Sequence, residues 1–155
     1  MAILTDTRLA MIQAMKTWPA LASTIKRFYT FEDFPGLIPG APNPTGGDIP
    51  ALEIFPAGGN SSWVLNQSQR VEYPMKFTLY TKDWNPAQGE VIWEETIKAA
   101  YQSFDGPTRA NRVTGFSPLS VALAQLGANG EGPRCLRWEW TIQIQADLWN
   151  PKTAT

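Results

Sequence analysis

The stretch "CLRWEWTIQIQADLW", residues 135–149, shows the clearest pattern in the chain. Apolar and polar residues alternate over residues 136–148, and a period of two is typical of a strand with one face against a core. The apolar positions are Leu136, Trp138, Trp140, Ile142, Ile144, Ala146 and Leu148, and the polar positions are Arg137, Glu139, Thr141, Gln143, Gln145 and Asp147. We therefore expect one long strand whose apolar face lies under a helix and whose polar face is open to solvent or to a partner.

The region before this strand is also rich in β-forming residues. The segment "RVTGFSPLSVALAQLG", residues 112–127, is interrupted by Gly115 and Pro118, and "ANGEGP", residues 128–133, has the composition of a turn. We expect this region and the long strand to form a hairpin at the end of the chain.

Two further strands are predicted earlier in the sequence. The segment "IPALEIFPA", residues 49–57, predicts a short strand, and "RVEYPMKFTLYTK", residues 70–82, predicts a longer one. Pro74 falls in the first half of the longer strand, where it can donate no hydrogen bond to a neighbouring strand. The sequence therefore predicts a sheet edge or a bulge at Pro74.

A first helix is predicted near the N-terminus. It should end at about Thr17, because Pro19 disfavours a helical conformation at the residue before it. Its apolar side is expected to consist of Leu4, Leu9, Ile12 and Met15. Residues 20–31, "ALASTIKRFYTF", follow either as a second short helix or as an extended stretch.

A longer helix is predicted after residue 85. Asn85 is a suitable N-cap, Pro86 fits the first helical position and Gly106 stands just past the end. The predicted apolar stripe consists of Trp93, Ile97, Ala100, Tyr101 and Phe104. The chain of 155 residues is of single-domain length, so we expect one α+β domain, residues 1–155, with a mixed or antiparallel sheet and helices on one face. The expected order is helix, strand, strand, helix, strand, strand.

A long segment rich in proline and glycine interrupts this order. Residues 34–50, "FPGLIPGAPNPTGGDIP", keep no hydrophobic period, so they predict a loop or an arm. Loops of this length are usually functional or mobile. Two interpretations stay open: an arm that a partner orders, and a plain connection.

The composition disfavours catalysis and recognition of nucleic acid. The chain has no histidine, which removes the commonest general base and metal ligand, and its single cysteine, Cys135, is expected to be a small core residue. The formal net charge is −1 with both signs scattered, and arginines 109, 112, 134 and 137 are expected to be solubilising charges. We therefore expect no enzyme, no cofactor and no metal site.

The N-terminal segment fits neither a signal peptide nor a membrane span. Asp6 and Arg8 interrupt its apolar run, and no other stretch approaches the roughly 18 apolar residues that a span needs. A soluble cytoplasmic protein is the simplest expectation. Trp18, Trp63, Trp84 and Trp149 fall at element ends or in loops, which favours a surface for a protein partner.

The element order resembles that of tail terminator or tail completion proteins of long-tailed bacteriophages. The resemblance covers about residues 4–148 and is carried by the N-terminal helix, "IPALEIFP", "VEYPMKFTLYTKD", "EVIWEETIKAAYQSF" and the final alternating hairpin. It implies a structural virion protein, assembled in the host cytoplasm, that forms a ring, commonly a hexamer, by strand-edge pairing and helix packing. Such a ring caps the tail tube, stops its elongation and joins it to the neck.

The resemblance also implies the partners. They are further copies of the chain, the tail tube protein and a neck or connector protein, with the sheath protein as a further candidate. No membrane and no direct recognition of nucleic acid is implied, although DNA passes through such a ring. Two alternatives stay open: a head-tail connector or head completion protein of the neck, and an unrelated regulatory protein-binding module.

Contact residues are predicted on the proline-rich loop and on the polar face of the last strand. The loop contributes Phe34, Leu37 and Ile38. The last strand contributes Arg134 at its start and the row Arg137, Glu139, Gln143 and Gln145.

Overall fold

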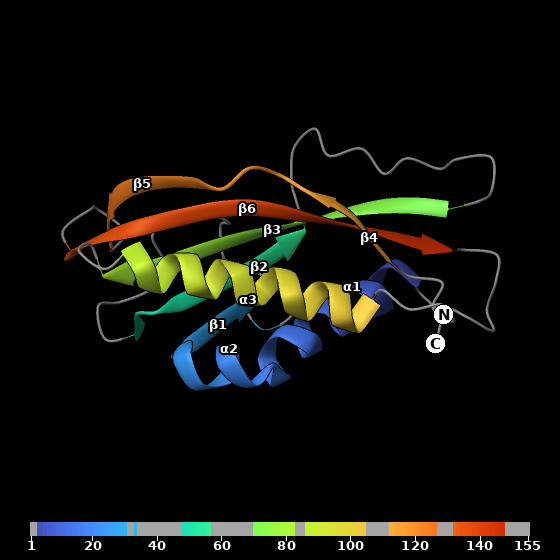
Figure 1. The fold of residues 1–155 in the computed structure, drawn as a ribbon, viewed down its shortest axis with the longest axis horizontal. Helices are drawn as coiled ribbons and strands as arrows, with labels where there is room; N and C mark the ends of the chain where they lie inside the picture. The colour runs from blue at the N-terminus through green and yellow to red at the C-terminus, as the bar shows by residue number, and fades with distance from the viewer. Residues whose placement is uncertain are drawn as a thin grey trace.

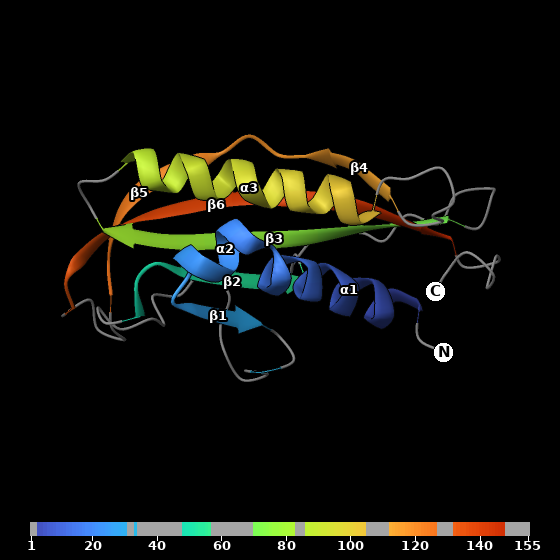
Figure 2. The same cartoon turned by 60° about the horizontal axis from the view of Figure 1, so that its bottom comes forward.

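The computed structural model describes residues 3–30, 33, 48–56, 70–82, 86–104, 112–126 and 132–147. Within them the fold is α+β: one sheet of six strands, with helices packed on one of its faces (Figure 1 and Figure 2). The helices are α1 (Ile3–Thr17), α2 (Pro19–Thr24) and α3 (Pro86–Phe104). The strands are β1 (Arg27–Thr30), β2 (Ala51–Pro56), β3 (Arg70–Lys82), β4 (Arg112–Phe116), β5 (Ser120–Gln125) and β6 (Arg134–Asp147).

The sheet is mixed, and its order is β1-β2-β3-β6-β4, with β5 also paired to β6. β1 and β2 run parallel, while β3 is antiparallel to both β2 and β6. β4 and β5 lie end to end along the same side of β6, so they complete the predicted hairpin. The two outer positions of the sheet are therefore β1 at one edge and the β4–β5 pair at the other.

The strand β6 is the long strand that its alternating pattern predicts, and it lies between β3 and the β4–β5 edge. Its register with β3 runs without a shift from Arg70↔Asp147 to Lys82↔Cys135. The apolar residues of both strands meet α1 and α3 in one core, and the rings of Phe77 and Trp140 are stacked with centroids 5.5 Å apart. Burying large aromatic rings contributes much of the stability of such a core.

Pro74 matches the edge alternative of its prediction. It stays in register with Gln143 of β6, and it lies one residue before the part of β3 that pairs with β2, Met75 to Tyr80. A residue without an N–H is tolerated there because no β2 residue faces it.

The first part of the chain differs from its prediction in two ways. α1 ends at Thr17 as expected, but Leu9 is 42% exposed and Met11 takes its place in the core. Both alternatives for residues 20–31 are partly right, because the short helix α2 is followed by the strand β1. The observed order therefore contains one more helix and one more strand than predicted at this point.

The side of α3 that packs against the sheet is rotated relative to the predicted apolar stripe. Ala100 is buried as predicted, but the other buried residues are Gly89, Ile92, Thr96 and Ala99, whereas Trp93 and Ile97 are half-buried and Tyr101 is 37% exposed. The reason is a close contact at Gly89, where an added Cβ would lie 2.1 Å from atoms of the Trp138 ring. Because only glycine allows this approach, the helix turns its Gly89 and Ile92 side to the sheet.

The face of the sheet opposite the helices is less open than predicted. Two small clusters are buried there: Ile49, Tyr80, Leu126 and Cys135 form one, and Tyr29, Ala51 and Phe55 form the other. Glu53 on the same face is only 1% exposed. Cys135 is buried as predicted.

Candidate functional site

The edge strand β5 is exposed along almost its whole length. Five of its six residues are exposed, and Val121 and Leu123 keep 46% and 60% of their surface. Within the described ranges, no strand pairs with its outer side, and the strand carries no charged residue. Natural edge strands are usually protected by charges, prolines or a covering segment. Among the described residues, no strand covers the outer side of β5, so Val121 and Leu123 stay exposed.

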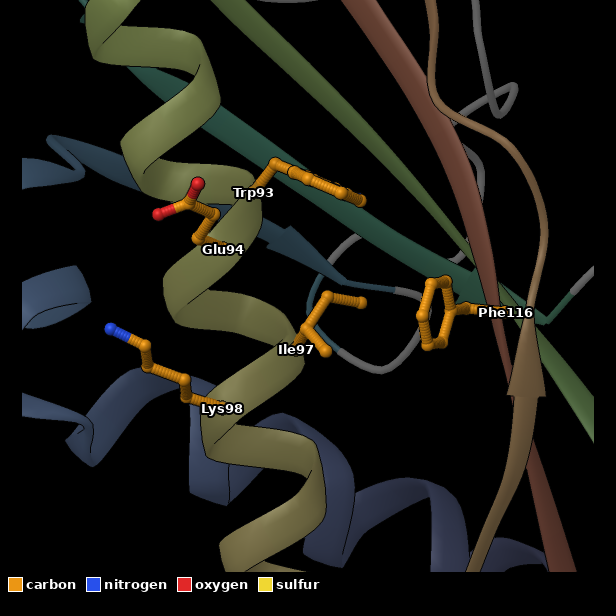
Figure 3. A pocket seen from close by; sticks show the side chains of 5 residues that line it. All are labelled: Trp93, Glu94, Ile97, Lys98 and Phe116. Carbon is orange, nitrogen blue, oxygen red and sulfur yellow. The ribbon is translucent and has the colours of Figure 1, made fainter.

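A small apolar pocket of about 230 Å³ lies between α3 and β4, the strand that shares this edge of the sheet with β5. Trp93 and Ile97 extend from the helix toward Phe116 of β4, while the charged ends of Glu94 and Lys98, which also line the pocket, point away from Phe116 (Figure 3). The Phe116 side chain is 47% exposed. Pockets for small-molecule ligands are usually larger than about 300 Å³, so this one is better suited to a single side chain.

The residues between β4 and β5 determine on which face of the sheet the apolar side chains of this edge lie. The Ser117 N–H donates to the Thr141 carbonyl oxygen at 2.9 Å, and the Thr141 N–H donates to Ser117 Oγ at 2.8 Å. The chain therefore stays attached to β6 through the break. As a result, Phe116 opposite Ile142 and Val121 opposite Trp138 both lie on the helix side of the sheet.

The outer surface of α3 beside the pocket is acidic. Glu90 and Glu94 are both exposed and are one helical turn apart. The nearby cation Lys98 is directed to Glu95, with Nζ 3.3 Å from Oε1. The edge surface, which we define as Phe116, Val121 and Leu123 with Trp93, Ile97, Glu90 and Glu94, thus combines an apolar floor with an acidic wall.

The opposite flank of α3 is tied to the start of the chain. Trp18 Nε1 donates to Glu95 Oε2 at 2.8 Å, and the Trp18 ring packs against the core. The hydrogen bond from Trp18 lowers the pKa of Glu95, and Lys98 adds to this effect. Trp18 is therefore a structural residue, which corrects its predicted place on a partner surface. Trp63, Trp84 and Trp149 lie outside the described residues.

The predicted polar row of β6 is present, but it is half-buried and internally paired. Glu139 accepts two ion pairs, one from Lys76 Nζ at 3.0 Å and one from Arg137 Nε at 2.9 Å. Gln143 lies further along the same face. These three predicted residues therefore share one surface, and the two charged ones stabilise each other across the sheet face.

Two buried tyrosines extend the polar network of this face toward β1. Burial, together with the charge of Glu53, raises the pKa of Tyr80. The Tyr29 hydroxyl donates to Asp48 Oδ2 at 3.0 Å, and burial with this hydrogen bond raises the pKa of Tyr29 to about 12. Both hydroxyls therefore stay protonated at neutral pH and act as structural groups.

The remaining predicted contact residues do not join this surface. Arg134 is exposed at the first position of β6, opposite Gln125. The backbone of Gln145 pairs with Glu72 and Arg112, and its side chain is not described. Phe34, Leu37 and Ile38 lie outside the described residues, so their predicted contacts stay predictions.

Reasoning from the sequence missed the edge surface. The signal was present in "SVALAQ", residues 120–125, where apolar residues occur without any charge directly after a proline break. What could not be read was that this strand occupies the edge of the sheet, because strand order depends on pairing between distant segments.

Comparisons with known proteins give no assignment for this surface. No known protein family matches the chain, and the search of curated proteins finds no match. Within the residues that the structure describes, no group of three or more acidic or cysteine side chains could hold a metal ion. Among those same residues, no helix is long and apolar enough to cross a membrane.

Proposed function

We propose that this protein is a structural subunit that assembles with copies of itself into a ring, and that the ring caps the tail tube of a long-tailed bacteriophage. The ring ends tube elongation and provides the surface that the neck binds. The residues of the edge surface bind a neighbouring protein and carry out no chemical step.

One observation carries the proposal: the uncharged, exposed edge strand β5. An exposed strand with unpaired backbone groups and apolar side chains favours pairing with another chain. A protein that uses such an edge for ordered assembly needs a contact that closes. A heterologous contact between identical subunits closes into a ring when the rotation between them allows it.

The half-buried row on β6 suits a second surface of such a ring. Glu139 is paired with both Arg137 and Lys76, which leaves a formal charge of only +1 among the three side chains, and Gln143 is uncharged. A surface of this kind approaches another protein, or passing DNA, without strong net attraction or repulsion. We therefore assign this row to contact with the tube or to the lining of the ring.

The test is the size of the purified protein with and without tail tube protein of the same phage. Size-exclusion chromatography with light scattering and negative-stain imaging should show a ring, either for the protein alone or at the ends of assembled tubes. Tubes polymerised in its presence should be shorter than tubes polymerised alone. A protein that stays monomeric at every concentration and never appears at a tube end would contradict the proposal.

A further inference from the structure

We infer that the uncovered strip of the sheet beside α3 binds an amphipathic helix of another protein, with its apolar side on the strip and its lysine or arginine residues beside Glu90 and Glu94. The strip consists of Phe116, Val121 and Leu123, which are exposed and lie on the helix side of the β4–β5 edge. The inference goes beyond the proposed ring, because it concerns a different protein and the face of this edge rather than its backbone.

α3 has a second apolar side, next to the one that packs on the sheet. The side of Gly89 faces the sheet, and this rotation leaves Trp93, Ile97 and Tyr101 on the neighbouring flank, each one helical turn after the last. Trp93 and Ile97 are only half-buried and point toward Phe116, and Tyr101 is 37% exposed (Figure 3). Among the described elements, no helix packs on this flank, because α1 and α2 lie on the other side of α3 (Figure 2). An apolar side of a helix is stabilised by packing against another element.

The strip has the dimensions of one helix. Phe116 lies opposite Ile142 of β6, and Leu123 lies opposite Leu136. At about 3.4 Å per residue along β6, the strip is about 20 Å long, which is the length of about four turns of helix. Neighbouring helices pack with their axes about 8–10 Å apart. A helix at this distance from α3 would cover both the strip and the second apolar side of α3.

A helix fits this place better than an added strand. Side chains of a strand stand roughly perpendicular to the sheet, so Val121 and Leu123 project toward the helix layer. A strand paired with the backbone of β5 would lie in the plane of the sheet and leave them open from above. A helix covers them, and one of its apolar side chains can fill the pocket of about 230 Å³ between Ile97 and Phe116. An apolar cavity of about 150 Å³ accepts a benzene ring, so this pocket has room for one large side chain.

The charges beside the strip favour a basic helix. Glu90 and Glu94 are exposed, and neither forms an ion pair with a residue that the structure describes. Lys98 is already paired with Glu95. The Glu94 carboxylate points away from Phe116, so a cation would meet it from the solvent-facing flank of the bound helix (Figure 3). Opposite charges across an interface steer association and set its register.

The described helices of a second copy do not supply this partner. α1 buries Met11 and Met15 in its own core, and its Lys16 is paired with Asp33 at 2.9 Å. α2 is six residues long and carries no charge, while α3 carries the acidic residues themselves. The structure therefore favours a helix of a different protein.

The experiment measures the binding of labelled synthetic peptides to the full chain by fluorescence anisotropy. Two peptides of about 20 residues have the same composition of leucine and lysine, one ordered with helical period and the other strictly alternating as in a strand. A third keeps the helical order with glutamate in place of lysine. The basic helical peptide should bind at least about tenfold more tightly than either of the others.

Two variants locate the binding. Val121→Thr with Leu123→Thr removes apolar surface but keeps β-forming residues, and it should weaken binding of the basic helical peptide about tenfold. Glu90→Gln with Glu94→Gln should weaken it about threefold to tenfold at low salt and less at high salt. Val91→Ser is the matched control, since Val91 is 56% exposed on the same helix but outside the strip, and it should bind normally.

Loss of folding must be distinguished from loss of the contact. All three variants should keep a melting temperature within about 3 °C of the unchanged protein, because the changed side chains are exposed. The glutamine variant decides the test if the variant on β5 unfolds.

The outcomes separate this inference from the proposed function. Tighter binding of the alternating peptide, no binding of the basic helical peptide, or equal binding by the unchanged protein and either folded variant of the strip overturns the inference. If rings form without selective binding of the basic helical peptide, only this inference fails. If that peptide binds selectively but no ring forms alone or on tubes, only the proposed function fails.

Discussion

β5 and β6 are neighbours in one sheet, and apolar residues recur along both. The apolar side chains of β6 are mostly buried, however, whereas those of β5 are mostly exposed. On β6, Trp140 is 2% exposed and Ile142 is fully buried. On β5, Val121 and Leu123 are 46% and 60% exposed. The difference arises because α1 and α3 pack on β6, whereas the edge strand extends beyond them. Alternation thus predicts a strand, while burial depends on what lies above it.

The largest difference in stability is expected when one apolar side chain on each strand is shortened to alanine. Trp140→Ala should lower the free energy of unfolding by about 3–5 kcal/mol, because it removes a buried ring stacked on Phe77. Leu123→Ala should cost about 0.5 kcal/mol or less in a monomer, since its side chain is already exposed. Urea denaturation measures both values. Similar losses for the two variants would contradict the assignment of core and surface.

A smaller loss is expected from Gly89→Ala on α3. In an exposed helix this change usually adds up to about 1 kcal/mol of stability, because glycine is a poor helix former. Here the new methyl group would overlap the Trp138 ring, so we expect a loss of about 1–3 kcal/mol instead. Val91→Ala, at a site 56% exposed on the same helix, is the control and should be nearly neutral. A stabilised Gly89→Ala variant would show that the helix does not approach β6 this closely.

A comparable loss is expected at the buried hydrogen bond between β3 and β6. Trp138 Nε1 donates to Thr81 Oγ1 at 2.9 Å. Thr81→Val should lower the free energy of unfolding by about 1–3 kcal/mol, because it leaves a buried donor without its acceptor. A double-mutant cycle with Trp138→Phe isolates the bond. Additive losses in that cycle would mean that the two side chains do not interact.

The smallest effect on stability is expected at the hydrogen bond between Trp18 and Glu95 of α3. The pKa of Glu95 is lowered below its ordinary value of 4.5, so its charge stabilises the fold above that pH and loses this effect as the pH falls through the lowered pKa. Glu95→Gln should therefore cost about 1 kcal/mol at pH 7. The difference from the unchanged protein should shrink below pH 4.5, as measured by thermal unfolding across pH. A difference that is constant across pH would contradict this assignment.

Most strands were predictable from the sequence because each has a local signal. β2 follows from its alternation and from Pro50 and Pro56, β3 follows from its alternation alone, and α3 begins at Pro86 as its capping pattern predicts. The short strand β1 had no clear signal, since four residues are too few to show a period. Its existence depends on pairing with β2, a segment twenty residues away in the chain.

The candidate site was less predictable than the fold. The sequence pointed to the polar row of β6, and the structure places Arg137, Glu139 and Gln143 on one face. The sequence did not indicate that Lys76 and Arg137 pair with Glu139, because the contact with Lys76 joins two strands that are distant in the chain. The edge surface was missed for the same reason: strand order depends on pairing between distant segments, and the rotation of α3 depends on the close packing of Gly89 on Trp138.

The assembly of a Leu123→Lys variant tests the central claim most directly. Light scattering should show the unchanged protein and the control Val91→Lys as rings, while Leu123→Lys, with a charge on the edge strand, should remain monomeric at the same concentration. The melting temperature of the Leu123→Lys monomer should stay within about 3 °C of the control. Rings of equal size and stability in all three proteins would contradict the assignment of β5 as the assembly edge.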